Sequence, residues 1–183
     1  EPTAVLTENR RQVAAWEQRN LARLREGRTA AALDEYWARG RVVITDSPEQ
    51  LVRGIAAAYV QVRTSEPDSR VAVLAATRAH ATAINDEVRA RLAASGVLQG
   101  PGLDVVTADG ARELRAGDAI IFTAPDRDHG LLNGQAAVVT GIDPARERVA
   151  VRVDDGRDLT LDAAWLAGGG LAHGYALTVH KAQ

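Results

Sequence analysis

Residues 71–75, with the sequence VAVLA, restrict the fold of this chain more than any other stretch. An uninterrupted apolar run of this length predicts a strand buried on both faces, as in parallel sheets covered by helices. Thr77 follows the run and can cap a helix over residues 78–95, in which apolar side chains recur at helical spacing. A buried strand, a polar turn and a helix form half of an α/β unit, and we therefore predict an α/β fold.

The chain before this unit is predicted to be mainly helical. Between residues 10 and 63, apolar side chains recur near helical spacing. One of these helices has a clear start, because Ser47 is followed by Pro48 at the first helical position and by Gln50 three residues after the cap, as in a capping box. The β-branched run at residues 42–45 predicts a short strand between helices.

The pattern changes from about residue 100 to short alternating runs separated by turn residues. The Asn-Gly pair at 133–134 and the Asp-Gly pair at 155–156 are strong hairpin signals. These features predict a small antiparallel barrel or curled sheet, inserted into the α/β domain. The apolar stretch YALTV then supplies one more strand, which we expect to rejoin the first sheet.

The composition excludes several classes of protein. The chain has no cysteine, which rules out disulfides and thiolate metal sites and points to a reducing cytoplasm. No apolar run approaches the roughly 18 residues that span a bilayer, so we expect a soluble, cytoplasmic protein without a membrane span. The net charge of −2 gives no overall basic field, and a local basic patch stays open. His173 and His180 have no further ligand at suitable spacing, and we expect no metal site.

A pair of arginines near the start of the chain is the first candidate binding element. Arg10 and Arg11 stand at the start of the first predicted helix, where the helix dipole disfavours cations. A guanidinium held there can bind a phosphate with bidentate geometry. The alternative is a solvated pair of charges.

Two further candidates lie at the ends of predicted strands. Thr77, the amides behind it and Arg78 can hold a phosphate at a helix N-terminus; the alternative is an ordinary cap beside an exposed arginine, and Asn85 is equally ambiguous. The last strand delivers four polar side chains to its carboxyl end, where open α/β sheets bind ligands. A hydroxyl, an imidazole, an ammonium and an amide favour phosphate and sugar contacts over a nucleophile with its base. These side chains belong to Thr178, His180, Lys181 and Gln183.

Four stretches of the chain resemble a known family. HGYALTVHKAQ is similar to motif V of the RecD-like branch of superfamily 1 DNA helicases, and its HGYA start most resembles conjugative relaxase-helicases of the TraA and TraI kind. LTENRRQ resembles motif IV of the superfamily. RVAVLAATRAHATAIN is similar to the strand, turn and helix of its second motor domain, and GDAIIFTAPDRDHGLLNGQAAVVTGID resembles its SH3-like insertion, called 2B. The resemblance covers essentially the whole chain.

The resemblance implies an α/β fold that is a partial second RecA-like motor domain (2A) of the P-loop NTPase type, with an inserted small SH3-like β-barrel (2B). By this division residues 1–99 are the first part of 2A, residues 100–162 are 2B, and residues 163–183 return to 2A and end in motif V. Walker A and Walker B motifs do not occur in the chain, which also lacks a methionine, so we expect it to be part of a larger protein. ATP and Mg²⁺ would bind in that parent protein, between 2A and the missing 1A domain. This chain alone is expected to bind neither and to hydrolyse no ATP.

The resemblance also implies roles for individual residues. Arg11 matches the arginine that reaches the ATP γ-phosphate and is the catalytic candidate, with Gln12 beside it as a second cofactor-binding candidate. Tyr175 and Phe122 are candidate platforms on which bases stack, with burial as the alternative. The residues expected to bind DNA are Thr77, Arg78, Thr178, His180, Lys181 and Gln183.

Three functions follow from the resemblance. The first is a part of an ATP-dependent 5′–3′ DNA helicase of a conjugative relaxase, which grips single-stranded DNA and contributes an arginine to the ATP site. The second is a non-catalytic recognition module that binds DNA or carries a type IV secretion signal. The third is a fragment of a stand-alone RecD-like repair helicase of the exonuclease V alpha type. Expected partners are single-stranded DNA, the 1A domain, a relaxase domain and type IV secretion components. The presence of Arg11 and of TVHK favours the motor, because a docking surface needs neither.

Overall fold

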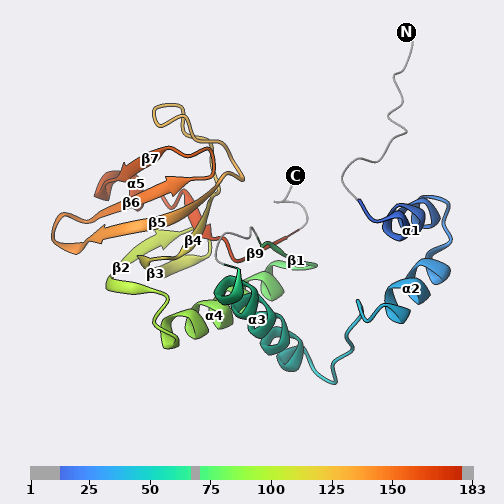
Figure 1. Ribbon diagram of the computed structural model, residues 1–183. Coiled ribbons are helices and arrows are strands. Elements are labelled where there is room, and N and C mark those ends of the chain that lie inside the picture. Colours follow the sequence, from blue (N-terminus) through green and yellow to red (C-terminus); the bar gives the residue numbers. More distant parts are fainter. Residues whose placement is uncertain (1–12, 67–70, 179–183) are drawn as a thin grey trace, which may run out of the picture. The chain divides into compact units, whose positions relative to one another are not determined.

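The computed structural model describes residues 13–66 and 71–178 of the chain (Figure 1). The chain divides into two compact units, residues 1–45 and residues 46–183, which are described separately. This division differs from the boundaries expected from the family resemblance, which remain a prediction.

The smaller unit is a pair of helices, α1 (Ala15–Arg25) and α2 (Thr29–Ala38). Asn20 of α1 is fully buried, and its Nδ2 donates a hydrogen bond to the carbonyl oxygen of Ala32 in α2 at 2.9 Å. A buried amide with a partner of this kind joins the two helices in a defined register. The helical prediction for this part of the chain is therefore confirmed.

The strand predicted at residues 42–45 is wrong. These residues form no strand in the described part of the chain, and the side chains of Val43 and Ile44 are 80% and 74% exposed. A β-branched run favours an extended backbone, but a strand also requires a neighbour that satisfies its backbone hydrogen bonds.

The larger unit contains an α/β part. This part consists of α3 (Pro48–Ser65), β1 (Val73–Ala75), α4 (Arg78–Ala94) and β9 (Ala176–Thr178). Strands β1 and β9 pair in parallel although about 100 residues separate them, with position 73 opposite 176 and position 75 opposite 178. The prediction that the last strand rejoins the first sheet is thus confirmed.

The predicted helix starts are also confirmed. The Ser47 hydroxyl oxygen accepts a hydrogen bond from the backbone N–H of Gln50 at 3.2 Å, and the Thr77 hydroxyl oxygen accepts one from His80 at 3.2 Å. Each contact satisfies one of the N–H groups that a helix leaves unpaired at its first turn. Helix α4 ends before Gly96, whose φ of +74° is the left-handed conformation that glycine adopts after a helix.

Burial of β1 on both faces is not observed. Ala75 is buried in a core that also contains Tyr59, Val88 and Tyr175. Leu74 lies on the opposite face of the strand and is 58% exposed. The apolar run therefore identified the strand correctly, but the described part of the chain leaves more than half of Leu74, on the second face, exposed.

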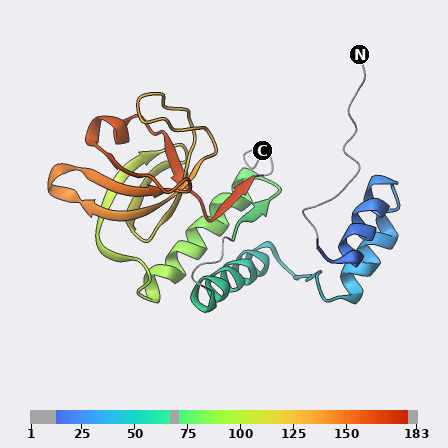
Figure 2. The same cartoon turned by 45° about the horizontal axis from the view of Figure 1, so that its top comes forward.

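Strands β2 to β8 form the antiparallel β region predicted from residue 100 onward, as seen in the two views of Figures 1 and 2. Five strands form one sheet in the order β7-β6-β5-β4-β8, and β2 pairs with β3 as a separate hairpin. Barrel closure needs edge strands that pair with each other, and among the described residues β7 and β8 remain edges, so no closed barrel is seen. The bounds are β2 (Gln99–Thr107), β3 (Gly110–Ala116), β4 (Ala119–Phe122), β5 (Ala136–Asp143), β6 (Arg148–Val153), β7 (Asp158–Leu161) and β8 (Leu171–His173), with a 3₁₀ turn (Pro144–Arg146) and α5 (Ala163–Ala167) between strands.

The β region has an apolar core of its own. Phe122 of β4 is fully buried and packs edge-on against Trp165 of α5, with ring centroids 5.7 Å apart. Aromatic pairs in this geometry add to the stabilisation that burial alone gives. The other fully or almost fully buried side chains are Leu114, Ile120, Leu131, Val139, Val149, Val151, Val153, Leu161 and Leu171.

Two residues separate β8 of the β region from β9 of the parallel sheet. Strand β8 pairs with β4, and after Gly174 and Tyr175 the chain enters β9. A Cβ atom at Gly174 would lie 2.9 Å from the carbonyl carbon of Ile120, so this close passage requires glycine. The short connection ties the position of β9 to that of the β region.

Candidate nucleic-acid interface

The described candidate residues meet where β1 and β9 end. Thr178 is the last residue of β9 and pairs with Ala75, the last residue of β1. Two residues further along, Thr77 caps α4 and Arg78 opens it. The carboxyl ends of two parallel strands and the N-terminus of a helix thus share one edge, the place at which open α/β folds bind ligands.

The charge at this edge is suited to an anion. A helix N-terminus carries a partial positive charge, and α4 is a helix of 17 residues that begins here. Arg78 is exposed and forms no ion pair with a described residue. The Thr77 side chain caps α4, as predicted, and its role toward a ligand stays a prediction.

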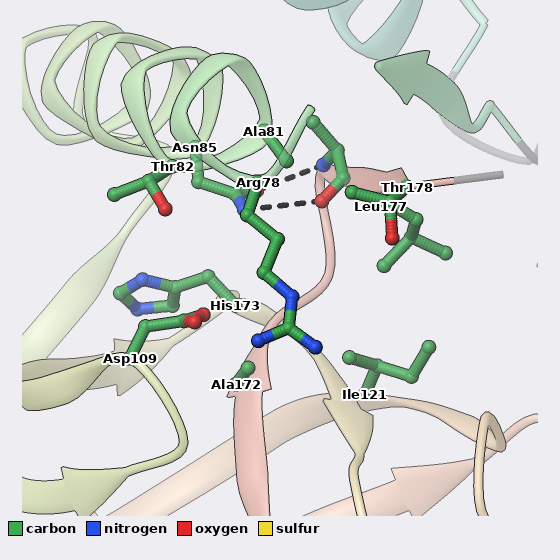
Figure 3. Close-up of a pocket in the computed structure, with 11 residues that line it drawn as sticks. Arg78, Ala81, Thr82, Asn85, Asp109, Ile121, Ala172, His173, Leu177 and Thr178 are labelled. Atoms are coloured by element: carbon green, nitrogen blue, oxygen red, sulfur yellow. Dashed lines mark hydrogen bonds between the residues drawn. The ribbon is translucent and has the colours of Figure 1, made fainter. Parts of the chain in front are cut away.

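A shallow pocket, open to solvent, lies beside these residues. Figure 3 shows the Arg78 side chain extending from α4 across it toward Ala172 and Ile121. Polar side chains line the other side. The polar residues that line it are Arg78, Thr82, Asn85, Asp109, His173 and Thr178.

Asn85 of α4 has a structural role, because its side chain binds the backbone of β9. Its Nδ2 donates to the carbonyl oxygen of Ala176 at 3.1 Å, and its Oδ1 accepts from the N–H of the same residue at 2.8 Å. Both bonds are buried and are drawn as dashed lines in Figure 3. The amide therefore occupies the place of a neighbouring strand at Ala176, two residues before Thr178.

His173 lies in β8 at the base of the pocket. It is 6% exposed, and its Nε2 has no hydrogen-bond partner among the described residues. Burial lowers the pKa of His173, so the imidazole is neutral at neutral pH. No cluster of three or more side chains that bind metals occurs within residues 13–66 and 71–178, and His180 lies outside them.

Five of the predicted site residues lie outside the described part of the chain. Arg11 and Gln12 lie before residue 13, and His180, Lys181 and Gln183 lie after Thr178. Their roles therefore stay predictions.

The two candidate stacking platforms are buried. Tyr175 is 1% exposed and Phe122 is 0% exposed, so neither ring has a free face for a base. The Tyr175 hydroxyl instead donates to Asp118 at 2.5 Å, in a buried network that sequence reasoning missed. The two residues are 57 positions apart, and no local pattern links them.

Two curated proteins are similar to this chain in sequence. The chain is 30% identical over 178 residues to the conjugal transfer protein TraA of Agrobacterium fabrum, covering 94% of this chain and 15% of that protein. It is 27% identical over 163 residues to the TraA protein of Sinorhizobium fredii, covering 87% of this chain and 14% of that protein. The chain is similar to a part of these TraA proteins. The resemblance to conjugative proteins that the sequence predicted is confirmed, and the chain spans about one seventh of the length of these relatives.

The other comparisons add less. No protein-family profile matches it. A crystal structure of the Pif1 helicase from Bacteroides is 18% identical and covers 97% of this chain and 42% of the other, with a TM-score of 0.46. A second Pif1 structure, in complex with ADP-AlF3 and single-stranded DNA, is 17% identical and covers 76% of this chain and 41% of the other, with a TM-score of 0.44. No helix among the described residues is long and apolar enough to cross a bilayer.

Proposed function

We propose that this chain belongs to the second motor domain of an ATP-dependent 5′–3′ DNA helicase, within a cytoplasmic conjugative relaxase, and that it grips single-stranded DNA at the ends of β1 and β9. The observation that carries the proposal is the shared edge formed by Thr178, Thr77 and Arg78. We also propose that residues 100–162 form an SH3-like 2B insertion between the two parts of that domain, residues 1–99 and 163–183.

The chemistry of the edge supports phosphate contacts. Strand ends and a helix N-terminus offer hydroxyl and N–H donors, which bind phosphate oxygens without reading the base sequence. Arg78 adds a cation that can pair with a phosphate in bidentate geometry. A motor that moves along DNA needs contacts of this kind, because it must hold every sequence equally well. In the proposed grip, His180, Lys181 and Gln183 extend the same set of donors beyond Thr178.

The ATP site is proposed to need a second domain. Arg11, with Gln12 beside it, would stabilise charge on the γ-phosphate of Mg²⁺-bound ATP at the boundary with the 1A domain. In a longer protein that contains 1A, Arg11→Ala is expected to abolish ATP hydrolysis and to leave DNA affinity nearly unchanged. Unchanged hydrolysis would remove Arg11 from the site.

The relatives favour conjugation over repair as the setting of this motor. The relatives are named as conjugal transfer proteins, which supports a relaxase and type IV secretion components as partners over a stand-alone repair helicase. The non-catalytic recognition module stays the second candidate. A Walker A lysine in the sequence that precedes this domain supports the motor, and its absence would support the module.

The DNA grip is tested by titrating the chain into a fluorescently labelled oligothymidylate and following its anisotropy at several salt concentrations. Arg78→Gln is expected to weaken binding at low salt and to reduce the slope of log K against log salt by about 0.7, the value for one phosphate contact on a single strand. Arg148→Gln is the matched control, because Arg148 is exposed on β6 and does not line the pocket. Equal slopes for the unmodified chain and the Arg78 variant would contradict a phosphate contact by Arg78.

A further inference from the structure

Asp118, in the turn between β3 and β4, is a fully buried carboxylate. Its Oδ1 accepts a hydrogen bond from the Tyr175 hydroxyl at 2.5 Å, and its Oδ2 accepts one from the backbone N–H of Arg115 at 2.6 Å. The Nε of Arg89 lies 3.2 Å and 3.3 Å from the two oxygens. Every side of the carboxylate is therefore occupied by a donor.

The charges around Asp118 are balanced. Arg89 also donates to Glu113 at 2.9 Å, and Arg115 donates to the same Glu113 oxygen at 2.7 Å. Two guanidinium groups thus face two carboxylates. Burial and the neighbouring carboxylate raise the pKa of Tyr175 far above its ordinary value, so the tyrosine hydroxyl keeps its proton and remains a donor.

The partners of Asp118 come from three parts of the larger unit. Arg89 belongs to α4, Arg115 belongs to β3 of the β region, and Tyr175 immediately precedes β9. The next residue, Ala176, is held by both hydrogen bonds of Asn85. Two consecutive residues before the strand end are therefore fixed by side chains from the β region and from α4.

This network is better explained by the positions of the residues that it joins than by a gain in the stability of the fold. Replacing a buried ion pair by apolar residues of similar volume is often neutral or stabilising, because the desolvation of the charges offsets their attraction. Directed hydrogen bonds, in contrast, restrict the arrangement of the groups that they join. The segment that they join here is the one that ends at Thr178.

We propose that Asp118 is a positioning residue, which holds Tyr175 and the following strand so that Thr178 lies beside Thr77 and Arg78. The β region then moves together with the strand end as one body. The consequence for DNA rests on the proposed function, whereas the positioning itself does not.

The test uses two tyrosines of the same core. Tyr175→Phe removes the hydrogen bond to Asp118 and keeps the ring. Tyr59→Phe is the matched control, because Tyr59 is 5% exposed, packs edge-on against the Tyr175 ring with centroids 5.7 Å apart, and is not a partner of Asp118. Backbone amide hydrogen exchange is measured for both variants and for the unmodified chain, without DNA.

Tyr175→Phe is expected to speed exchange at residues 176–178 by about tenfold, as for the loss of a hydrogen bond to a charged group, while the amides of β5 and β6 exchange as before. Tyr59→Phe is expected to leave residues 176–178 unchanged. A uniform acceleration throughout the larger unit would mean that the hydroxyl merely stabilises the fold, and it would overturn the proposal, as would unchanged exchange at residues 176–178.

A second readout connects positioning to binding. The affinity of the folded Tyr175→Phe chain for oligothymidylate is expected to fall by roughly threefold, less than the loss of a direct contact, and that of the Tyr59→Phe chain to stay the same. Local acceleration of exchange with unchanged affinity would overturn the role of Asp118 toward DNA. If the unmodified chain itself failed to bind, the proposed function would fail, and the exchange experiment would still decide whether Asp118 positions the strand.

Discussion

The β region and the α/β edge of the larger unit stabilise their strands in different ways. Strand β4 contributes two almost fully buried side chains, Ile120 and Phe122, to an apolar core, whereas β1 and β9 are three residues long and Leu74 of β1 is 58% exposed. Ala75, Tyr175 and Ala176 lie in a second apolar core, and β9 is also joined by polar contacts, from Asn85 to its backbone and from Asp118 to the residue before it. The β region therefore relies on apolar burial, whereas the edge combines apolar burial with a few buried hydrogen bonds that join β9 to α4 and to the β region.

The largest expected effect is a loss of stability in the β region. Phe122→Ala removes a fully buried ring and is expected to lower the free energy of unfolding by about 3–5 kcal/mol, because it loses apolar burial and leaves a cavity. Leu74→Ala, at the edge, is expected to cost less than about 1 kcal/mol, because most of this side chain is already in water. Urea unfolding followed by circular dichroism measures both, and equal losses would contradict the contrast between the two regions.

A smaller effect is expected for Asn85, whose side-chain amide binds the backbone of Ala176 in the place of a neighbouring strand. Asn85→Ala leaves the buried N–H and C=O of Ala176 without partners and is expected to cost about 1–3 kcal/mol. Asn133→Ala, in an exposed turn of the β region, is the matched control and is expected to stay within about 0.5 kcal/mol of the unmodified chain. If urea unfolding gave both variants the same stability, Asn85 would not hold β9.

The helix start at the edge gives a third test. Thr77→Ala removes the cap of α4 and is expected to cost about 1 kcal/mol, whereas Thr77→Ser keeps a hydroxyl and should retain most of the stability. The same unfolding experiment distinguishes them. A loss of equal size in the serine variant would show that the methyl group, not the cap, matters.

The smallest effect concerns pH and lies in the β region. The side-chain hydrogen bond from Trp165 and then that from His129 hold the pKa of Asp126 at about 2, below its ordinary value of 3.8. The unfolded chain therefore binds this proton first, so the contribution of Asp126 is present above about pH 4 and is lost as the pH falls toward 2. Thermal unfolding between pH 5 and pH 2 should show a flatter acid decline for Asp126→Asn than for the control Asp128→Asn. Parallel declines would contradict the assignment.

The sequence predicted the local features of the fold better than the contacts between distant residues. The cap at Thr77, the end of α4 before Gly96 and the return of the last strand to β1 all follow from short patterns, and all are confirmed. An apolar pattern indicates which side chains a stretch can bury, but not which other part of the chain covers them. For this reason the sequence predicted a strand at residues 42–45, which has no partner in the described part of the chain, and a second buried face for β1, which is not observed.

The contacts that shape the edge have no local signal. Asn85 and Ala176 are 91 residues apart, and Asp118 lies 29 residues from Arg89. An asparagine on a helix and an aspartate in a turn are ordinary residues in any single sequence. Only the fold shows that both hold the segment before Thr178.

The most direct test of the DNA grip compares the two regions in one experiment, by amide hydrogen exchange of the chain with and without an excess of oligothymidylate. Bound DNA is expected to slow exchange at the start of α4, residues 78–82, and at residues 176–178, and to leave the amides of β5 and β6 unchanged. Protection confined to β5 and β6, or no protection at residues 78–82 and 176–178 when the oligonucleotide is bound, would contradict a nucleic-acid interface at the ends of β1 and β9.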